Sequence, residues 1–313
     1  MHSKGGKQLK SGILFLVICV LALLSSCQQA APTEDIYSFE QDKQNFQIIH
    51  TAALFKNYIE QAQKNPSEAS SDLYQETVIQ PIYDECFKKG EYIYMADATL
   101  YDAPTRLTEL KIINDFLATN QTQINEEIQE ALEKSAALLP TEKGVTVCIF
   151  PSIDTNASPY TVGAGKIIIP YNNLFDADFL KTTIAHEYHH SMYAEKGLHY
   201  DINTVLDNLI FEGKAVMFEK MVYPTLESTP VDPTYDKNFW AEIEKDLDTI
   251  NSTRSLEILR GGNELPFLYG YSEGYKMIES YLANAPSTSI EKWTSLSTQE
   301  IIDKGNYFSH YDE

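Results

Sequence analysis

The chain has 313 residues, of which 24 are Lys or Arg and 45 are Asp or Glu, giving a net charge of −21 at neutral pH. A surface this acidic repels phosphate backbones and anionic lipid head groups, so nucleic acid is excluded as an expected partner. Apolar residues make up 43% of the chain, which is typical of a globular protein with a buried core and excludes a disordered chain.

The first 26 residues resemble a bacterial export signal. Lysines precede an apolar run of twelve residues at 13–24, ILFLVICVLALL, and small residues follow the run. A bilayer-spanning helix needs about 20 apolar residues, so the run favours a signal peptide at 1–26 over a permanent anchor.

Directly after this run, Leu24-Ser25-Ser26-Cys27 is similar to the lipobox of bacterial lipoproteins. The resemblance implies that Cys27 carries a lipid and attaches the chain to a membrane. The residues from 27 to 40 show no apolar periodicity, so we expect them to be the lipidated cysteine and a linker. Gln28 in place of an aspartate implies, by the enterobacterial sorting rule, the outer membrane of the cell envelope.

One folded domain is expected at 41–313, and its N-terminal part, about 41–140, is predicted to be helical. Apolar residues recur there at three- and four-residue spacing in three segments: FQIIHTAALFKNYIEQAQK, LYQETVIQPIYDECFKK and LTELKIINDFLATNQTQINEEIQEALEKSAALL. Pro81 lies inside the second segment and is expected to kink or split that helix.

Two short β-branched runs follow, Val145–Phe150 and Lys166–Pro170, and each is closed by a proline, which is typical of strands. The 15 residues between them, 151–165, are rich in turn formers and predict a loop. A loop this long in a compact domain is usually functional, so we expect it to shape a cleft.

The two cysteines of the folded domain are Cys86 and Cys148. An exported chain permits a disulfide between them, but their spacing does not indicate one. Cys148 lies within VTVCIF, which favours a buried apolar cysteine.

From about residue 174 the pattern is helical again, in DADFLKTTIAHEYHHSMYAEKG and DINTVLDNLIFEGKAVMFEKMVYP and in weaker segments to the end. The fold class is therefore α+β: mostly helical, with a small β-sheet before the helix that contains HEYHH.

This HEYHH stretch carries the clearest chemical signal. Successive side chains of a helix are about 100° apart, so His186 and His190 lie one turn apart on one face and both reach a single ion. Glu187 is displaced to the side, where it reaches a water beside that ion. HExxH in this arrangement supplies two zinc ligands and a general base.

A catalytic zinc site needs a third protein ligand. Five downstream residues offer a suitable donor: His199, Asp201, Asp207, Glu212 and Glu219. The pattern HExxHxxGxxH is excluded, because Tyr193 and Lys196 stand where it needs Gly and His. Glu212 is the strongest candidate, because an antiparallel helix pair would bring it back toward His190. The neighbouring Gly213 indicates a close backbone approach at that point.

With HEYHH and Phe211-Glu212-Gly213-Lys214-Ala215, the chain resembles the gluzincin metallopeptidases. It is most similar to a family of predicted zinc-dependent proteases that carry HEYHH and a later EGxA. The similarity covers about 70–285 and includes YQETVIQP at 74–81 and GYSEGY at 270–275, which echo a family YxxxVxxP and GYxxGY.

The resemblance implies a zincin-like core, in which an edge strand above the HExxH helix can hold an extended substrate. It assigns His186, His190 and Glu212 as ligands of one Zn²⁺ and Glu187 as the general base. Lys214 departs from the pattern, since the family usually has an apolar residue at its position, and we expect no consequence.

A second donor to the developing oxyanion is usual in such enzymes. Tyr271 is the first choice, and Tyr275 and His199 remain open. Asp207 and His189 are candidates to orient the ligands, but either also fits a surface position.

The function expected is a zinc metallopeptidase that cleaves peptides or proteins at the bacterial cell envelope. Two alternatives remain: a non-catalytic zinc-binding envelope lipoprotein, and a zinc hydrolase of a non-protein amide. Glu187 favours catalysis, because a purely structural zinc site has no need of a general base.

Overall fold

The computed structural model describes residues 35–64, 71–226 and 229–312. The expected signal peptide, Cys27 and most of the expected linker lie outside the described residues. Within them, no helix is long and apolar enough to cross a bilayer.

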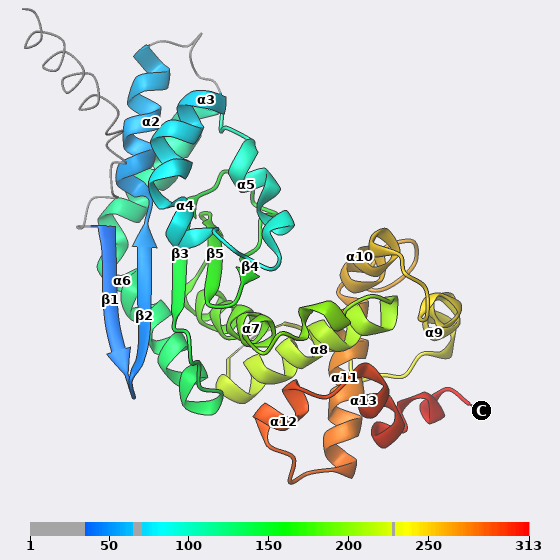
Figure 1. The fold of residues 1–313 in the computed structure, drawn as a ribbon. Helices are drawn as coiled ribbons and strands as arrows, with labels where there is room; N and C mark the ends of the chain where they lie inside the picture. Colours follow the sequence, from blue (N-terminus) through cyan, green and yellow to red (C-terminus); the bar gives the residue numbers. More distant parts are fainter. Residues whose placement is uncertain (1–34, 65–70, 227–228, 313) are drawn as a thin grey trace, which may run out of the picture.

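A five-stranded mixed sheet lies at the centre of the N-terminal half, in the order β1-β2-β3-β5-β4 (Figure 1). Its strands are β1 (Ile36–Gln41), β2 (Gln44–His50), β3 (Val145–Pro151), β4 (Tyr160–Gly163) and β5 (Lys166–Tyr171). The three central strands run parallel, and β1 and β4 are antiparallel edge strands. The predicted strands at 145–150 and 166–170 are thereby confirmed.

The β1–β2 hairpin corrects two predictions. Residues 36–40, expected to be linker, belong to strand β1, and the predicted first helix is a strand up to His50. Asp42 and Lys43 both have positive φ, as a two-residue hairpin turn requires. Phe46 and Ile48 alternate with polar residues at a period of two, whereas the residues after His50 are helical. The predicted helix therefore combined a strand pattern and a helix pattern in one segment.

β4 corrects a third prediction, because residues 160–163 of the expected loop form an edge strand. The segment is only four residues long and stands between Pro159 and the turn before β5, so neither its length nor its composition distinguished it from a loop. The remaining part, 152–159, is irregular.

Alternate strand residues face two apolar layers. Ile49, Cys148, Phe150 and Ile168 pack against the helices from α2 to α5. Ile48, Val147, Ile167 and their neighbours pack against α6 and α7. These helices are α2 (Ala52–Lys64), α3 (Ser71–Tyr74), α4 (Gln80–Cys86), α5 (Asp97–Tyr101), α6 (Leu107–Leu138) and α7 (Ala177–Glu195), with a π-helical turn at Gln75–Ile79 and a 3₁₀ turn, η4, at Ile93–Ala96.

Pro81 lies in the first turn of α4, directly after the π-helical turn, so the α-helical pattern is interrupted where the proline was expected to kink or split the helix, and the chain stays helical across this point. The helix predicted at about 107–139 is confirmed as α6. Cys86 and Cys148, whose pairing the sequence did not indicate, form a disulfide that joins α4 to β3. Both cysteines are fully buried.

The C-terminal half is helical: α8 (Val205–Val222), α9 (Lys237–Ile243), α10 (Ser252–Arg260), α11 (Tyr269–Asn284), α12 (Ile290–Thr294) and α13 (Thr298–Gly305). In Figure 1 the helices α9 to α13 lie on the far side of α7 and α8 from the sheet. The fold class is α+β, mostly helical with a small sheet before the HEYHH helix, as predicted.

Helices α8 and α11 cross at two glycines. A Cβ atom on Gly213 would lie 2.1 Å from the carbonyl carbon of Gly274, and one on Gly274 would lie 2.0 Å from the carbonyl oxygen of Leu209. Only glycine permits this approach. The close backbone approach predicted at Gly213 is confirmed.

Candidate metal centre

Helix α7 presents the HEYHH stretch from a buried position. The Asp176 carboxylate caps its first turn by accepting from the Phe179 N–H. The helix then runs between the sheet and α8, and every residue from Ile184 to Ala194 is buried. His186 and His190 therefore lack the freedom of surface histidines and project from one face into the interior.

Helix α8 supplies the acidic partner. Gly197, with φ of 73°, ends the turn after α7, and Thr204 and Asp207 form a capping box that starts α8. This turn folds α8 back along α7, which brings Glu212, in the second turn of α8, to the two histidines.

The donor atoms of these three residues converge. The Nε2 atoms of His186 and His190 are 3.1 Å apart, and they lie 3.2 and 3.3 Å from one oxygen of Glu212. The corners of a tetrahedron around an ion with bonds of about 2.0 Å are about 3.3 Å apart, so three corners of such a site are already formed. Among the described residues, this is the group of His, Cys, Asp and Glu with ligand atoms close enough to hold an ion.

The carboxylates of the cluster attract positive charge, either a proton or a metal ion. Although burial opposes protonation, the carboxylates of Glu212 and Glu219 raise the pKa of His186 well above its usual value. Burial likewise favours a neutral Glu212, yet His190 and His186 hold its pKa far below the usual range. The protein itself thus places carboxylates around two imidazoles, and the donor set, two imidazoles and one carboxylate, is one that zinc accepts.

Two further side chains hold the imidazole rings in place. A carboxylate oxygen of Glu219 lies 3.0 Å from Nδ1 of His186, on the ring edge away from the cluster. The ring of Phe211 stacks on His190 with centroids 4.1 Å apart. Glu219, weighed from the sequence as a third ligand, instead orients one.

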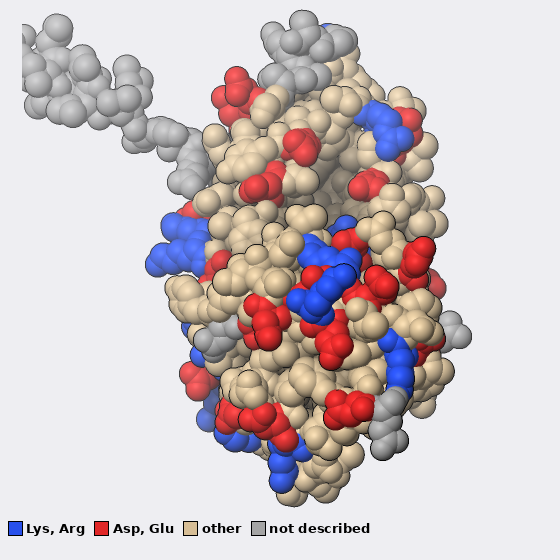
Figure 2. Space-filling view, turned by 90° about the vertical axis from the view of Figure 1, so that its right-hand side faces the viewer, with Lys and Arg blue, Asp and Glu red and all other residues tan. Residues whose placement is uncertain are grey.

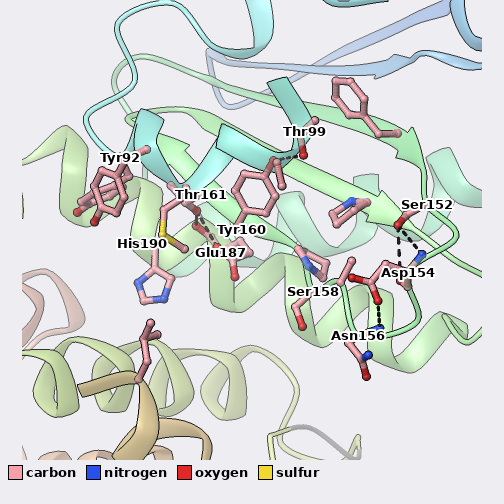
Figure 3. A pocket seen from close by; sticks show the side chains of 18 of the residues that line it. Tyr92, Thr99, Ser152, Asp154, Asn156, Ser158, Tyr160, Thr161, Glu187 and His190 are labelled. Carbon is pink, nitrogen blue, oxygen red and sulfur yellow. Dashed lines mark hydrogen bonds between the residues drawn. The ribbon is translucent and has the colours of Figure 1, made fainter. Parts of the chain in front are cut away.

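Glu187 lies beside the cluster and under the edge strand. The Thr161 hydroxyl of β4 is 2.8 Å from the main-chain carbonyl oxygen of Glu187 and 2.9 Å from its carboxylate (Figure 3). Burial raises the pKa of Glu187, and the two histidines partly offset this effect. A carboxylate with a raised pKa next to a cation site is suited to accept a proton near neutral pH.

Of the three candidate oxyanion donors, Tyr271 is closest to the cluster. It lies in the first turn of α11, and its ring centroid is 6.2 Å from that of His186. Burial, Glu212 and Glu187 raise the pKa of Tyr271 well above its usual value, so it remains a hydrogen-bond donor. Tyr275 donates to Glu279 and does not line the cavity described below, whereas His199 lines that cavity, with its ring packed on Tyr200.

The two residues considered as orienting groups have other partners. Asp207 accepts from Thr204 in the capping box and from the Thr298 hydroxyl. His189 is fully buried, stacks on Trp293 and lies 3.2 Å from the Thr294 hydroxyl. Both side chains therefore connect α7 and α8 to the C-terminal helices, and the His189 ring also contacts that of His190.

Lys214, expected to be without consequence, is fully buried. Its Nζ donates to the carbonyl oxygens of Thr294 and Leu296, at the C-terminal end of α12. A cation at this position complements the unpaired carbonyls of a helix end. The apolar residue usual in the resembled family could not make these bonds.

The cluster opens into a cavity of about 1740 Å³ between the two halves of the molecule. Its walls come from η4, from the segment 150–161, from α7 and from the helices α8, α10 and α11. Figure 3 shows Glu187 and His190 of α7 and Tyr160 of β4 facing this space, and Figure 2 shows a hollow on that side of the molecule. The predicted role of residues 151–165 in shaping a cleft agrees with this lining.

A comparison with protein-family models matches residues 124–303 to the family described as Predicted Zn-dependent protease (DUF2268). The match covers more than half of the chain and includes both histidines, Glu187, Glu212 and Tyr271. The YQETVIQP segment lies outside it. Searches of the curated proteins and of the solved structures gave no match.

Proposed function

The chain belongs to this family of predicted Zn-dependent proteases, and from that premise we propose that it is a metallopeptidase that hydrolyses peptide bonds with Glu187 as the general base. The observation that carries the proposal is the convergence of three donor atoms 3.1 to 3.3 Å apart, with the Glu187 carboxylate beside them.

His186, His190 and Glu212 would hold one zinc ion. When bound, zinc supplies Lewis-acid polarisation of the substrate carbonyl and acidifies the attacking water. The Glu219 carboxylate keeps Nδ1 of His186 occupied, so that its Nε2 lone pair faces the ion. Phe211 restricts the rotation of the His190 ring.

Glu187 accepts a proton from the attacking water and delivers it to the leaving amine. The Thr161 hydroxyl fixes the orientation of this carboxylate, which the reaction needs because proton transfer depends on distance and angle. Tyr271 donates a hydrogen bond to the oxygen that becomes negatively charged as the carbonyl carbon turns tetrahedral.

The cell envelope is the proposed location. The basic residues, the apolar run at 13–24 and the lipobox-like LSSC support export and a lipid on Cys27, with the outer membrane as the destination that Gln28 favours. The membrane contact would then be made through this lipid.

The test is a paired measurement of zinc content and hydrolysis. The purified protein should bind one zinc ion and cleave members of a mixed peptide library. Glu187→Gln should retain zinc but lose about 10²- to 10⁴-fold in activity, because it removes the general base. Glu60→Gln, an exposed glutamate on α2, serves as the matched control and should leave activity unchanged.

Each alternative has its own outcome. Zinc binding without hydrolysis of any peptide or amide would indicate a non-catalytic zinc protein. Hydrolysis of small amides but of no peptide would indicate a non-protein substrate. A protein that binds no stoichiometric zinc would refute the site itself.

A further inference from the structure

Exposed apolar side chains gather around the cleft. Sixteen large hydrophobic residues are well exposed among the described residues, and eight of them line this one cavity. The cavity is lined by fewer than a fifth of the described residues, so this share is far above an even distribution. Isolated exposed hydrophobics need no explanation, but a group around one opening indicates a binding surface.

These side chains stand on both walls. On the wall nearer the sheet they are Tyr94 and Met95 of η4, Leu174 and Phe179. On the opposite wall they are Tyr200, Ile250, Leu256 and Phe267. Ile250, Tyr200 and Phe267 are 81%, 79% and 78% exposed, so they add nothing to the core and are available to a ligand.

Few charged side chains line the cavity beside these apolar residues. Outside Glu187 and Glu212, the charged residues that line the cavity are Glu91, Asp102, Arg106, Asp154 and Arg260. Of these, Glu91 accepts from the Ala164 N–H and Arg106 donates to the Ile153 carbonyl. The cleft therefore has no dense field of one sign that would select a charged substrate.

The edge strand can contribute few main-chain hydrogen bonds. The Tyr92 N–H already donates to the Val162 carbonyl oxygen, and the Ala164 N–H is taken by Glu91. Pro159, just before β4, has no N–H to give. These contacts limit the length of β4 with which an extended chain could pair, so its affinity must come mainly from buried side chains.

We propose that the substrates are apolar segments inside longer polypeptides, held in extended form with apolar side chains on both sides of the cleaved bond. This inference rests on the proposed function and names the substrate class of the same site. Segments of this kind are exposed in unfolded proteins and buried in folded ones, so an unfolded chain is the preferred partner.

Binding and cleavage of two blocked peptides of equal length test the proposal. Both are acetylated and amidated; one carries Leu, Phe and Tyr around its centre, and the other carries Ser and Gln there. Glu187→Gln protein, whose binding can be measured without turnover, should bind the apolar peptide about 10- to 100-fold more tightly, as burial of one or two such side chains predicts. The active protein should show the same preference in kcat/KM.

We call the eight exposed apolar side chains that line the cavity the rim. Single variants of the rim sharpen the test. Phe267→Ser and Ile250→Ser should each raise KM for the apolar peptide several-fold and leave kcat and the polar peptide unaffected. Ile112→Ser is the matched control, because Ile112 is 67% exposed on α6 but does not line the cavity. It should change nothing.

The possible failures are distinct. Equal cleavage of the two peptides would overturn the substrate class and leave the peptidase standing. Tight, selective binding without any cleavage would support the apolar surface but refute the peptidase. If cleavage required a substrate with a free carboxyl terminus, which Arg260 would bind, the proposal that the substrates are internal segments would be overturned. Binding of phosphatidylcholine vesicles through Phe267, without selection between the peptides, would make the rim a lipid contact instead.

Discussion

The sheet and the α8–α11 helix pair bury different kinds of side chain. Within the described residues, the five strands bury no Asp, Glu, Lys or Arg, whereas α8 and α11 bury Lys214, Glu219, Glu273 and Lys276. A sheet pairs its own backbone and fills both faces with apolar residues. The helix pair instead surrounds its charges with partners: Lys276 lies 2.6 Å from Glu273, and Lys214 binds main-chain carbonyls.

This difference explains where the candidate metal cluster lies. Three carboxylates and two imidazoles would be costly within the apolar layers of the sheet. They are placed where the sheet half ends and the polar helix pair begins, with β4 contributing only Thr161. The apolar half thus holds α7 rigidly, and the polar half supplies Glu212 and Glu219.

The largest expected effect comes from breaking a buried ion pair in the helix half. Glu273→Ala leaves the Lys276 ammonium without its partner and removes the acceptor of the Tyr307 and Tyr311 hydroxyls. The free energy of unfolding should fall by about 3–5 kcal/mol, measured by denaturant titration. Glu279→Ala, exposed on the same helix, should cost less than about 0.5 kcal/mol. Equal costs would mean that the buried charges of the helix half do not depend on their partners.

In the sheet half, the Cys86–Cys148 disulfide is the buried link to compare with this ion pair. Replacing Cys86 and Cys148 by alanine opens a link between residues 62 positions apart. The chain-entropy model gives a loss of up to about 4 kcal/mol. Denaturant midpoints with and without reductant check this: the wild type should become less stable on reduction, and the double variant should not respond. No response of the wild type would show that the bond adds no stability.

Overpacking the helix crossing should cost somewhat less. Gly274→Ala drives a methyl group against the Leu209 carbonyl oxygen, for an expected loss of about 1–3 kcal/mol. Gly262→Ala is the control, because its added Cβ would meet only a Glu257 side-chain atom at 3.8 Å. Thermal and denaturant unfolding should separate the two variants, and an unchanged Gly274→Ala protein would mean that the helices separate freely.

One side-chain hydrogen bond joins β4 of the sheet half to the Glu187 carboxylate on α7. Thr161→Val removes the hydroxyl that holds the Glu187 carboxylate, and we expect roughly a tenfold loss of kcat/KM, equivalent to one hydrogen bond to a charged group. Since that bond favours the charged carboxylate, its loss should also shift the acidic limb of the pH profile to higher pH. Thr146→Val on β3 is the control. A lower kcat/KM with an unmoved acidic limb would contradict a positioning role.

The smallest effect concerns pH and the sheet half alone. Burial lowers the pKa of His50, against the Asn125 side chain that opposes the shift. As the pH falls below about 6.5 the unfolded chain gains a proton that the folded chain resists, so stability decreases by at most about 1.4 kcal/mol per pH unit. His50→Leu should flatten this dependence between pH 7 and 5 in denaturant titrations. An identical slope in both proteins would mean that folding does not lower the pKa of His50.

Much of the fold followed from local patterns. The helices α6, α7 and α8 and the strands β3 and β5 carry enough periodic apolar residues to be recognised singly. β1, β2 and β4 were missed because they are short and lie beside a turn or a helix of compatible composition. Whether such segments pair is decided by the neighbouring strand, which local composition does not contain.

The candidate site divides in the same way. The spacing of His186, Glu187 and His190 is a property of one helix, so the sequence indicated how the three side chains are related. Glu212 was preferred because an antiparallel helix pair would bring it back toward His190; the close approach that Gly213 indicated is to Gly274 of α11. Glu219 and Thr161 carry no such local mark, and their contacts to His186 and Glu187 exist only because β4 and α8 pack on α7.

By itself, then, the sequence determined the α+β class, the pair of histidines with the adjacent glutamate, and the preferred third donor, because each depends on helical geometry or on an intrinsic backbone preference. The tertiary structure alone decided the disulfide, the burial of Lys214, the contacts of Thr161 with Glu187 and of Glu219 with His186, and the exposed apolar side chains around the cleft. All of these are contacts between residues far apart in the chain, and their formation depends on how whole elements pack.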